Sequence, residues 1–162
     1  MAASTKHLSA ESWRQADPQF LAEAGLTLDE WARAVLRPEL PRPVPGDIRQ
    51  LFETARGTLL YGAFYLPVLN LAADQLYRVA DAALNVRAFG PGGNRDRLGF
   101  AQRIGFAVQR GWIAAADEMQ WMSLAALRNE STHATAPRPL PPRAALHTLE
   151  LVARSVGDLF AG

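Results

Sequence analysis

The residue types best suited to acid–base chemistry are concentrated in the segment 127–133, which reads Leu-Arg-Asn-Glu-Ser-Thr-His. It combines a fixed cation, Arg128, an amide, Asn129, and a proton-transfer group, His133. Histidine can act as base or acid near neutral pH because its unperturbed pKa is about 6.5. Arginine can bind two phosphate oxygens at once. Such a set could cleave RNA without a metal: the imidazole would take the proton of a 2′-hydroxyl group, and the guanidinium would stabilise charge on the phosphate.

This segment is predicted to end a helix, because it follows the helical run 117–127 and precedes the proline-rich stretch 137–142. With about 3.6 residues per turn, positions 129 and 133 share a face, whereas positions 128 and 133 are about 140° apart. Arg128 and His133 can therefore meet only if the helix loosens near its end or if a second chain contributes its own copy. A two-fold symmetric dimer could place two copies of both residues in one cleft.

A purely structural role is the alternative interpretation of the same residues. Arg128 could pair with Glu118 or Glu130, or bind carbonyl groups of the last helical turn. His133 could interact with the negative end of the helix dipole. Asn129 could orient either the imidazole or a bound phosphate.

Other candidates for chemistry are weaker. His147, near the start of the last helix, is predicted to be half-buried in the bundle. Three scattered histidines without a Glu-x-x-His pattern predict neither a metal site nor a cofactor. The glycine-rich segment 90–94 lacks the preceding strand and the lysine of a phosphate-binding loop, so we interpret it as a connection between helices. The tryptophans are predicted to be core or interface anchors.

Five arginines stand against a single acidic residue, Asp96, between residues 87 and 110. They could form a basic track for RNA phosphates, or simply a solvated helix face. The full set is Arg87, Arg95, Arg97, Arg103 and Arg110, of which Arg95, Arg97 and Arg103 are the RNA-binding candidates.

The composition narrows the class of protein. A chain of 162 residues with 49% hydrophobic and 20% charged residues suits one soluble globular domain. The absence of cysteine excludes disulfides, thiolate metal sites and cysteine nucleophiles, and agrees with a cytoplasmic protein. A net charge of +1 gives no general attraction to polyanions, so RNA binding would need a local patch. No signal peptide is predicted, and the longest uncharged run, 57–73, is shorter than the roughly 20 apolar residues that span a bilayer.

Helix signals recur along the chain, and no segment alternates with a period of two, so the sequence predicts an all-α fold. Residues 1–40 form a helical N-terminal appendage: a short helix from Ser9 or Ser12 through Trp13, a helix capped by Asp17, and a helix with a capping box at Thr27. Residues 41–46 form a proline-rich linker. Residues 47–162 form an antiparallel up-and-down bundle of four to five helices.

Within this bundle, the first helix is predicted to begin with Asp47 as its N-cap, and Pro67 to kink or break it. The chain then resumes as a helix that ends at Gly90. Further helices are predicted over 95–110, over 117–133 and from Pro142 onward.

The Arg-x4-His spacing of Arg128 and His133, at the end of the penultimate helix of an all-helical domain, resembles the HEPN superfamily. The interrupted segment 60–67, followed by the amphipathic run 69–88, resembles the first helical hairpin of bacterial HEPN proteins. Together these features cover about residues 47–161. The resemblance implies a metal-independent endoribonuclease of a toxin or defence system, active as a dimer through Arg128, Asn129 and His133. Because many HEPN domains are non-catalytic, the alternative is a helical interaction or ligand-sensing module.

The sequence departs from this family at one position. Toxins that are silenced by a nucleotidyltransferase antitoxin carry a tyrosine shortly after the histidine, whereas His133 is followed by Ala-Thr-Ala-Pro and no tyrosine occurs downstream. The resemblance therefore does not predict silencing of that type, although another antitoxin protein could be a partner.

A homodimer is predicted, with its two-fold axis near residues 128–133. The run 59–73 is apolar around nearly its whole circumference and requires cover on several faces. A second protomer could provide this cover, and so could the N-terminal appendage.

Overall fold

The computed structural model describes residues 6–93, 98–133 and 138–161, without the side chains of residues 132 and 133. Within these ranges the fold is all-α, as predicted, with seven α-helices, one short 3-10 helix and no strand. The helices are α1 (Pro18–Ala24), α2 (Leu28–Leu36), α3 (Gly46–Tyr61), α4 (Val68–Phe89), α5 (Phe100–Gln109), the 3-10 helix η1 (Ala115–Asp117), α6 (Glu118–His133) and α7 (Pro142–Leu159).

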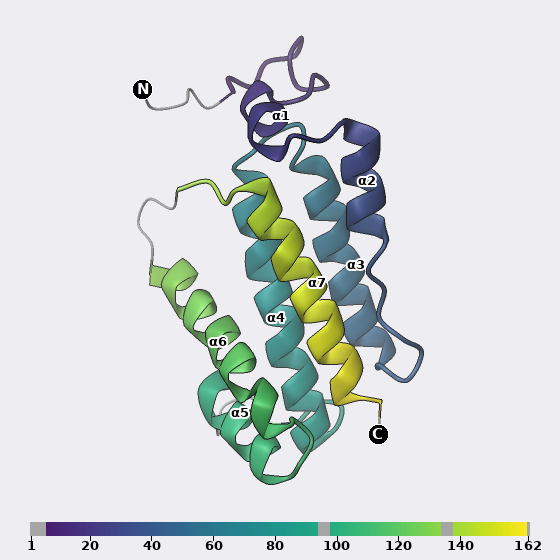
Figure 1. Cartoon of the computed structure of the whole chain (residues 1–162), viewed down its shortest axis with the longest axis vertical. Helices are drawn as coiled ribbons and strands as arrows, with labels where there is room; N and C mark the ends of the chain where they lie inside the picture. Colours follow the sequence, from purple (N-terminus) through teal and green to yellow (C-terminus); the bar gives the residue numbers. More distant parts are fainter. Residues whose placement is uncertain (1–5, 94–97, 134–137, 162) are drawn as a thin grey trace.

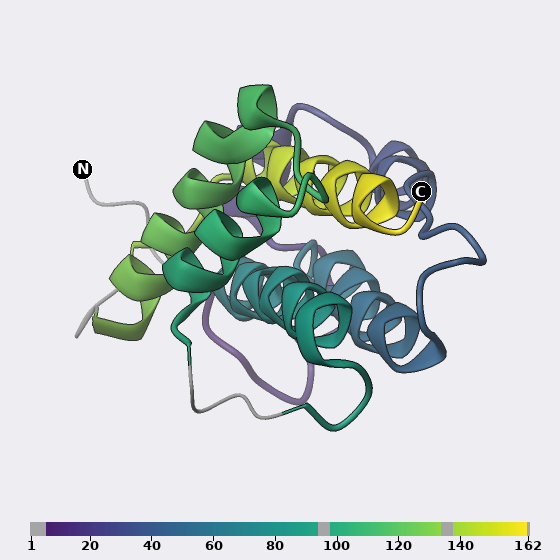
Figure 2. The same cartoon turned by 90° about the horizontal axis from the view of Figure 1, so that it is seen from below.

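Three long helices form the centre of the bundle. Helix α4 makes its most extensive contacts with α3 and α7, and the three helices run alongside one another (Figure 1). Helices α5 and α6 pack against each other and against α4, while α1 and α2 both contact α7 (Figures 1 and 2). None of the helices in the described ranges is long and apolar enough to cross a membrane.

Helix α4 is buried on more than one face, which explains its apolar composition. Ala82, Ala83, Leu84 and Asn85 are consecutive and all at most 8% exposed, so buried side chains extend around most of the helix rather than along a single stripe. Neighbouring helices of the same chain therefore cover α4. Leu59 and Leu69, in the apolar run that predicted a second protomer, are likewise fully buried within one chain, so their burial does not by itself require a dimer.

The N-terminal helices share this core through a buried aspartate. Asp17 caps α1, where its Oδ1 accepts a hydrogen bond of 2.9 Å from the backbone N–H of Gln19. Its Oδ2 accepts another, also 2.9 Å, from the N–H of Leu66, and its own N–H donates to the carbonyl of Ala63 at 2.8 Å. Since Asp17 is 1% exposed, these bonds are shielded from water. They tie α1 to the connection between α3 and α4.

A second link joins α2 to α3. The indole N–H of Trp31, which is 1% exposed, donates to the carbonyl of Leu59 at 3.0 Å. Phe20 and Trp31 pack edge to face with ring centroids 4.9 Å apart. The division into an appendage (1–40), a linker (41–46) and a bundle (47–162) stays a prediction, but the first and last of these ranges share one hydrophobic cluster.

Local signals located most helix ends correctly. The Asp17 cap, the capping box of Thr27 and Glu30, and the start of α7 at Pro142 are confirmed. Pro67 marks a complete break, because α3 ends at Tyr61 and α4 begins at Val68.

Two predicted helix starts are wrong. Residues around Ser9 and Ser12 form a turn rather than a helix, because each serine hydroxyl accepts a hydrogen bond from the backbone N–H of the other. Helix α3 begins at Gly46 after Pro45, so Asp47 lies in its first turn and is not the N-cap. The described part of the predicted helix 95–110 begins as a helix at Phe100.

Candidate functional site

The predicted catalytic segment lies in the last turns of α6, which is a regular helix through His133. The helix therefore does not loosen before His133, and positions 128 and 133 stay about 140° apart around its axis. Asn129 is exposed. The side chain of His133 lies outside the described part of the chain. Of the three predicted catalytic side chains, the structure therefore describes those of Arg128 and Asn129.

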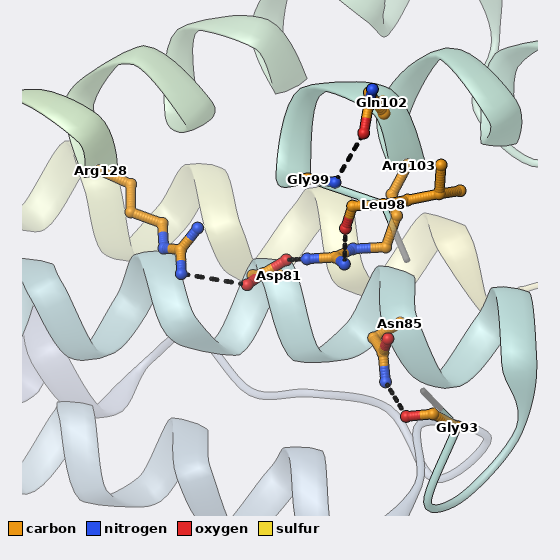
Figure 3. Close-up of polar contacts among 8 residues, drawn as sticks. All are labelled: Asp81, Asn85, Gly93, Leu98, Gly99, Gln102, Arg103 and Arg128. Atoms are coloured by element: carbon orange, nitrogen blue, oxygen red, sulfur yellow. Dashed lines mark hydrogen bonds and ion pairs between the residues drawn. The ribbon is translucent and has the colours of Figure 1, made fainter. Parts of the chain in front are cut away.

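The side chain of Arg128 is directed toward α4. Its Nη2 lies 3.4 Å from Oδ2 of Asp81, and its guanidinium carbon lies 5.9 Å from the ring centroid of Phe100 (Figure 3). In the described part of the chain, the acidic partner of Arg128 is thus Asp81. The structural interpretation of the sequence had offered Glu118 or Glu130 for this role. The side chain of Arg128 is 37% exposed, so it is both anchored and accessible from one side.

A second arginine binds the same carboxylate. Arg103, on α5, donates to Oδ1 of Asp81 and to the carbonyl of Leu98. Figure 3 shows the two guanidinium groups on opposite sides of the Asp81 carboxylate. The side chains of Arg103 and Asp81 are only 5% and 18% exposed, so their attraction is strengthened by poor access to water. We refer to Asp81, Arg103 and Arg128 as the Asp81 cluster; its formal charge is positive, with two cations and one anion.

Short-range contacts position the cluster. The side-chain oxygen of Gln102 accepts a hydrogen bond of 2.9 Å from the N–H of Gly99, the N-cap residue of α5. This bond fixes the first turn of the helix, which carries Arg103. One turn beyond Asp81, the buried Asn85 donates to the carbonyl of Gly93 at 3.4 Å (Figure 3). The cluster thus joins α4, α5 and α6 at one place.

The predicted basic track is not found as a surface feature at Arg103. This residue is 4% exposed and its guanidinium lies between helices, because Asp81 is its partner. Arg95 and Arg97 lie outside the described residues. Arg87 and Arg110 each stack on an aromatic ring, with guanidinium carbons 5.2 Å from the ring centroid of Trp112 and 4.9 Å from that of Phe106, respectively.

One further sequence prediction needs correction. His147 is exposed on α7 rather than half-buried. Trp31 and Trp121 are core residues, as predicted, whereas Trp13 is 57% exposed.

The sequence interpretation missed Asp81. The available signal was an acidic residue inside the apolar run 79–84.

A buried tyrosine lies close to the same end of α6. Burial raises the pKa of Tyr77 above its ordinary value, and the negative charges of Asp74 and Glu130 raise it further, while a hydrogen bond with Thr148 acts in the opposite direction. Glu130 directly follows Asn129, so Tyr77 links α4, α6 and α7 near the candidate site.

The raised pKa of Tyr77 predicts a loss of stability in alkaline solution. Above pH 10 or so, the unfolded chain releases the phenolic proton while the folded protein still holds it, so the free energy of unfolding falls as pH rises. In Tyr77→Phe this part of the loss should disappear, with a cost of about 1 kcal/mol at neutral pH for the hydrogen bond. Urea unfolding at pH 8 and above pH 10 measures both. Tyr61→Phe, at a position that is 70% exposed, is the control, and equal alkaline losses in wild type and Tyr77→Phe would contradict the assignment.

The described residues contain no group of three or more His, Cys, Asp or Glu side chains that could hold a metal ion. Comparison with known proteins found no family model, no curated protein and no solved structure that matches this chain.

Proposed function

We propose that this protein is a HEPN-like, metal-independent endoribonuclease that acts as a homodimer through Arg128, Asn129 and His133. The observation that carries the proposal is the anchoring of Arg128. A half-exposed arginine, held by Asp81 beside an exposed Asn129, precedes a histidine by about one and a half helical turns. The resemblance of the Arg-x4-His segment to HEPN ribonucleases is consistent with this arrangement.

Asp81 would act as a positioning residue for Arg128. A guanidinium that is already held in place loses less conformational freedom when it binds a phosphate oxygen. Asp81 would normally cancel the charge of its partner, but it is shared with Arg103. The Asp81 cluster therefore keeps a formal positive charge, which favours an anionic substrate.

The reaction would use two histidines. His133 of one protomer would take the proton from a ribose 2′-hydroxyl group, whose oxygen attacks the adjacent phosphorus. The bond from phosphorus to the 5′-oxygen breaks, and His133 of the partner subunit would donate a proton to that oxygen. The products are a 2′,3′-cyclic phosphate and a 5′-hydroxyl end. Arg128 would stabilise the negative charge on the phosphorane.

The dimer is supported by the geometry of α6. The helix places positions 128 and 133 about 140° apart around its axis, so the two positions of one protomer lie on different faces. A two-fold axis near the end of α6 would bring two copies of the segment together and would cover Leu127, whose side chain is 42% exposed.

The proposal is tested by incubating the purified protein with single-stranded RNA in the presence of EDTA. We expect fragments that end in 2′,3′-cyclic phosphate, and a dimer by light scattering at micromolar concentration. Mass spectrometry of the fragments identifies the ends. A stable monomer of 17.7 kDa, or RNA that stays intact in the presence and absence of divalent metal, would reject the proposal.

A second candidate function is a non-catalytic module that binds another protein. It is favoured by Met119 and Met122, which are 80% and 40% exposed at the other end of α6. Flexible, exposed methionines are common at adaptable binding surfaces, and a two-fold axis near residue 130 would leave them uncovered. If this function is correct, the wild-type protein does not cleave RNA. The double variant Met119→Glu with Met122→Glu then loses binding of the protein partner.

A further inference from the structure

A pocket of about 600 Å³ lies where the connection between α5 and α6 faces the C-terminal half of α7. Figure 2 shows this connection beside the end of α7. Its apolar wall contains Ile113, Trp121 and Leu159, which are at most 4% exposed. Gln120, also in the wall, is about 12 Å along α6 from Arg128, so the pocket is separate from the proposed ribonuclease site. Its volume falls within the roughly 300–1,000 Å³ of small-molecule sites.

Hydrogen bonds among residues of the pocket wall join α6 to α7. Nη2 of Arg154 lies 3.3 Å from Oε1 of Gln120, and Nε2 of Gln120 donates to Oγ of Ser155 at 2.8 Å. Ser155 is 4% exposed. These bonds hold the guanidinium of Arg154 toward α6, although Asp158 follows it by one turn on α7, at a spacing where an ion pair often forms.

Two carboxylates line the pocket as well. Asp117 and Asp158 are exposed, and among the described residues neither forms an ion pair. Asp158 lies in the last turn of α7, where the free carbonyl groups already produce a negative potential and basic residues are favoured. With Arg154 as the only basic residue in the wall, the formal charge of the pocket is negative.

We propose that this pocket binds a small organic cation, namely an ammonium group carried on an aromatic or aliphatic body. The ammonium group satisfies the carboxylates of Asp117 and Asp158 and the negative end of α7. The body of the ligand packs against Ile113 and Trp121. An anion of the same size is disfavoured by both carboxylates and by the helix end.

The test compares two probes that share a phenyl ring and differ in charge, phenethylamine and 3-phenylpropanoate. Titration calorimetry of the full chain should give saturable binding of phenethylamine and at least about tenfold weaker binding of 3-phenylpropanoate, since the favourable contact becomes a repulsion. Quenching of tryptophan fluorescence provides a second measurement, because Trp112 and Trp121 line the pocket.

Variants locate the binding. Asp117→Asn with Asp158→Asn should weaken phenethylamine binding at least about tenfold, and circular dichroism should show a folded protein because both residues are exposed. Asp29→Asn, at an exposed carboxylate on α2, is the matched control and should bind as the wild type does. The proposal is overturned if phenethylamine does not bind, if the two probes bind equally, or if the double variant binds phenethylamine unchanged. RNA cleavage is measured in a separate assay. The outcome of the phenethylamine experiment therefore neither supports nor rejects the ribonuclease proposal.

Discussion

Replacing His133 by alanine is expected to slow RNA cleavage by about 10²- to 10⁴-fold, the usual contribution of a general acid–base group. The effect should be larger than that of losing one positioning contact, because the dimer would lose its base and its acid together. Initial rates of cleavage of a labelled RNA oligonucleotide, at saturating substrate and in EDTA, provide the measurement.

Two companion variants separate catalysis from folding. His147→Ala removes an exposed histidine on α7 and should cleave at the wild-type rate. Arg128→Lys keeps the positive charge but loses the planar fork, so we expect a loss of about 10²-fold. If His133→Ala and His147→Ala cleave equally well, His133 is not the acid–base group.

The variant Asp81→Ala should lower the free energy of unfolding by about 3–5 kcal/mol, since it removes the carboxylate that both Arg103 and Arg128 contact. Arg103 is the side chain left behind, with only 5% exposure. Arg128 contributes less because it is 37% exposed and reaches water. Urea unfolding followed by circular dichroism measures the change as a shift in midpoint at an unchanged slope.

The matched control for Asp81→Ala is Asp74→Ala, two turns earlier on α4, where the described residues show no ion pair. It should change stability by no more than about 0.5 kcal/mol. A double variant, Asp81→Ala with Arg103→Leu, removes both buried charges and should recover part of the loss. If Asp81→Ala and Asp74→Ala have equal effects, the Asp81 cluster does not hold α4, α5 and α6 together.

Much of the fold could be predicted because its signals are local. Asp17 before Pro18, and Thr27 three residues before Glu30, specify helix starts through hydrogen bonds within one turn. Pro67 removes a backbone donor wherever it occurs. The serines near residue 10 misled the prediction because a hydroxyl that can cap a helix can equally close an isolated turn.

The candidate site could be predicted only in part, because its geometry depends on tertiary contacts. The spacing of Arg128, Asn129 and His133 is visible in the sequence, but nothing in that segment indicates Asp81, which lies on another helix. Arg103 was expected at the surface because charged residues usually are. Its burial depends on a carboxylate 22 residues away, and no local pattern encodes that pairing.

The position of α7 has a consequence for the order in which the chain can fold during synthesis. Helix α7 covers α4 and contacts α1 and α2, and Arg37 of the N-terminal region binds Glu150 across 113 residues of sequence. The ribosome adds about 5–20 residues per second, so the first three-quarters of the protein wait several seconds without this helix. During that interval the face of α4 that α7 will cover is exposed to water. The nascent chain therefore exposes this apolar surface until α7 has been made and can dock on α4.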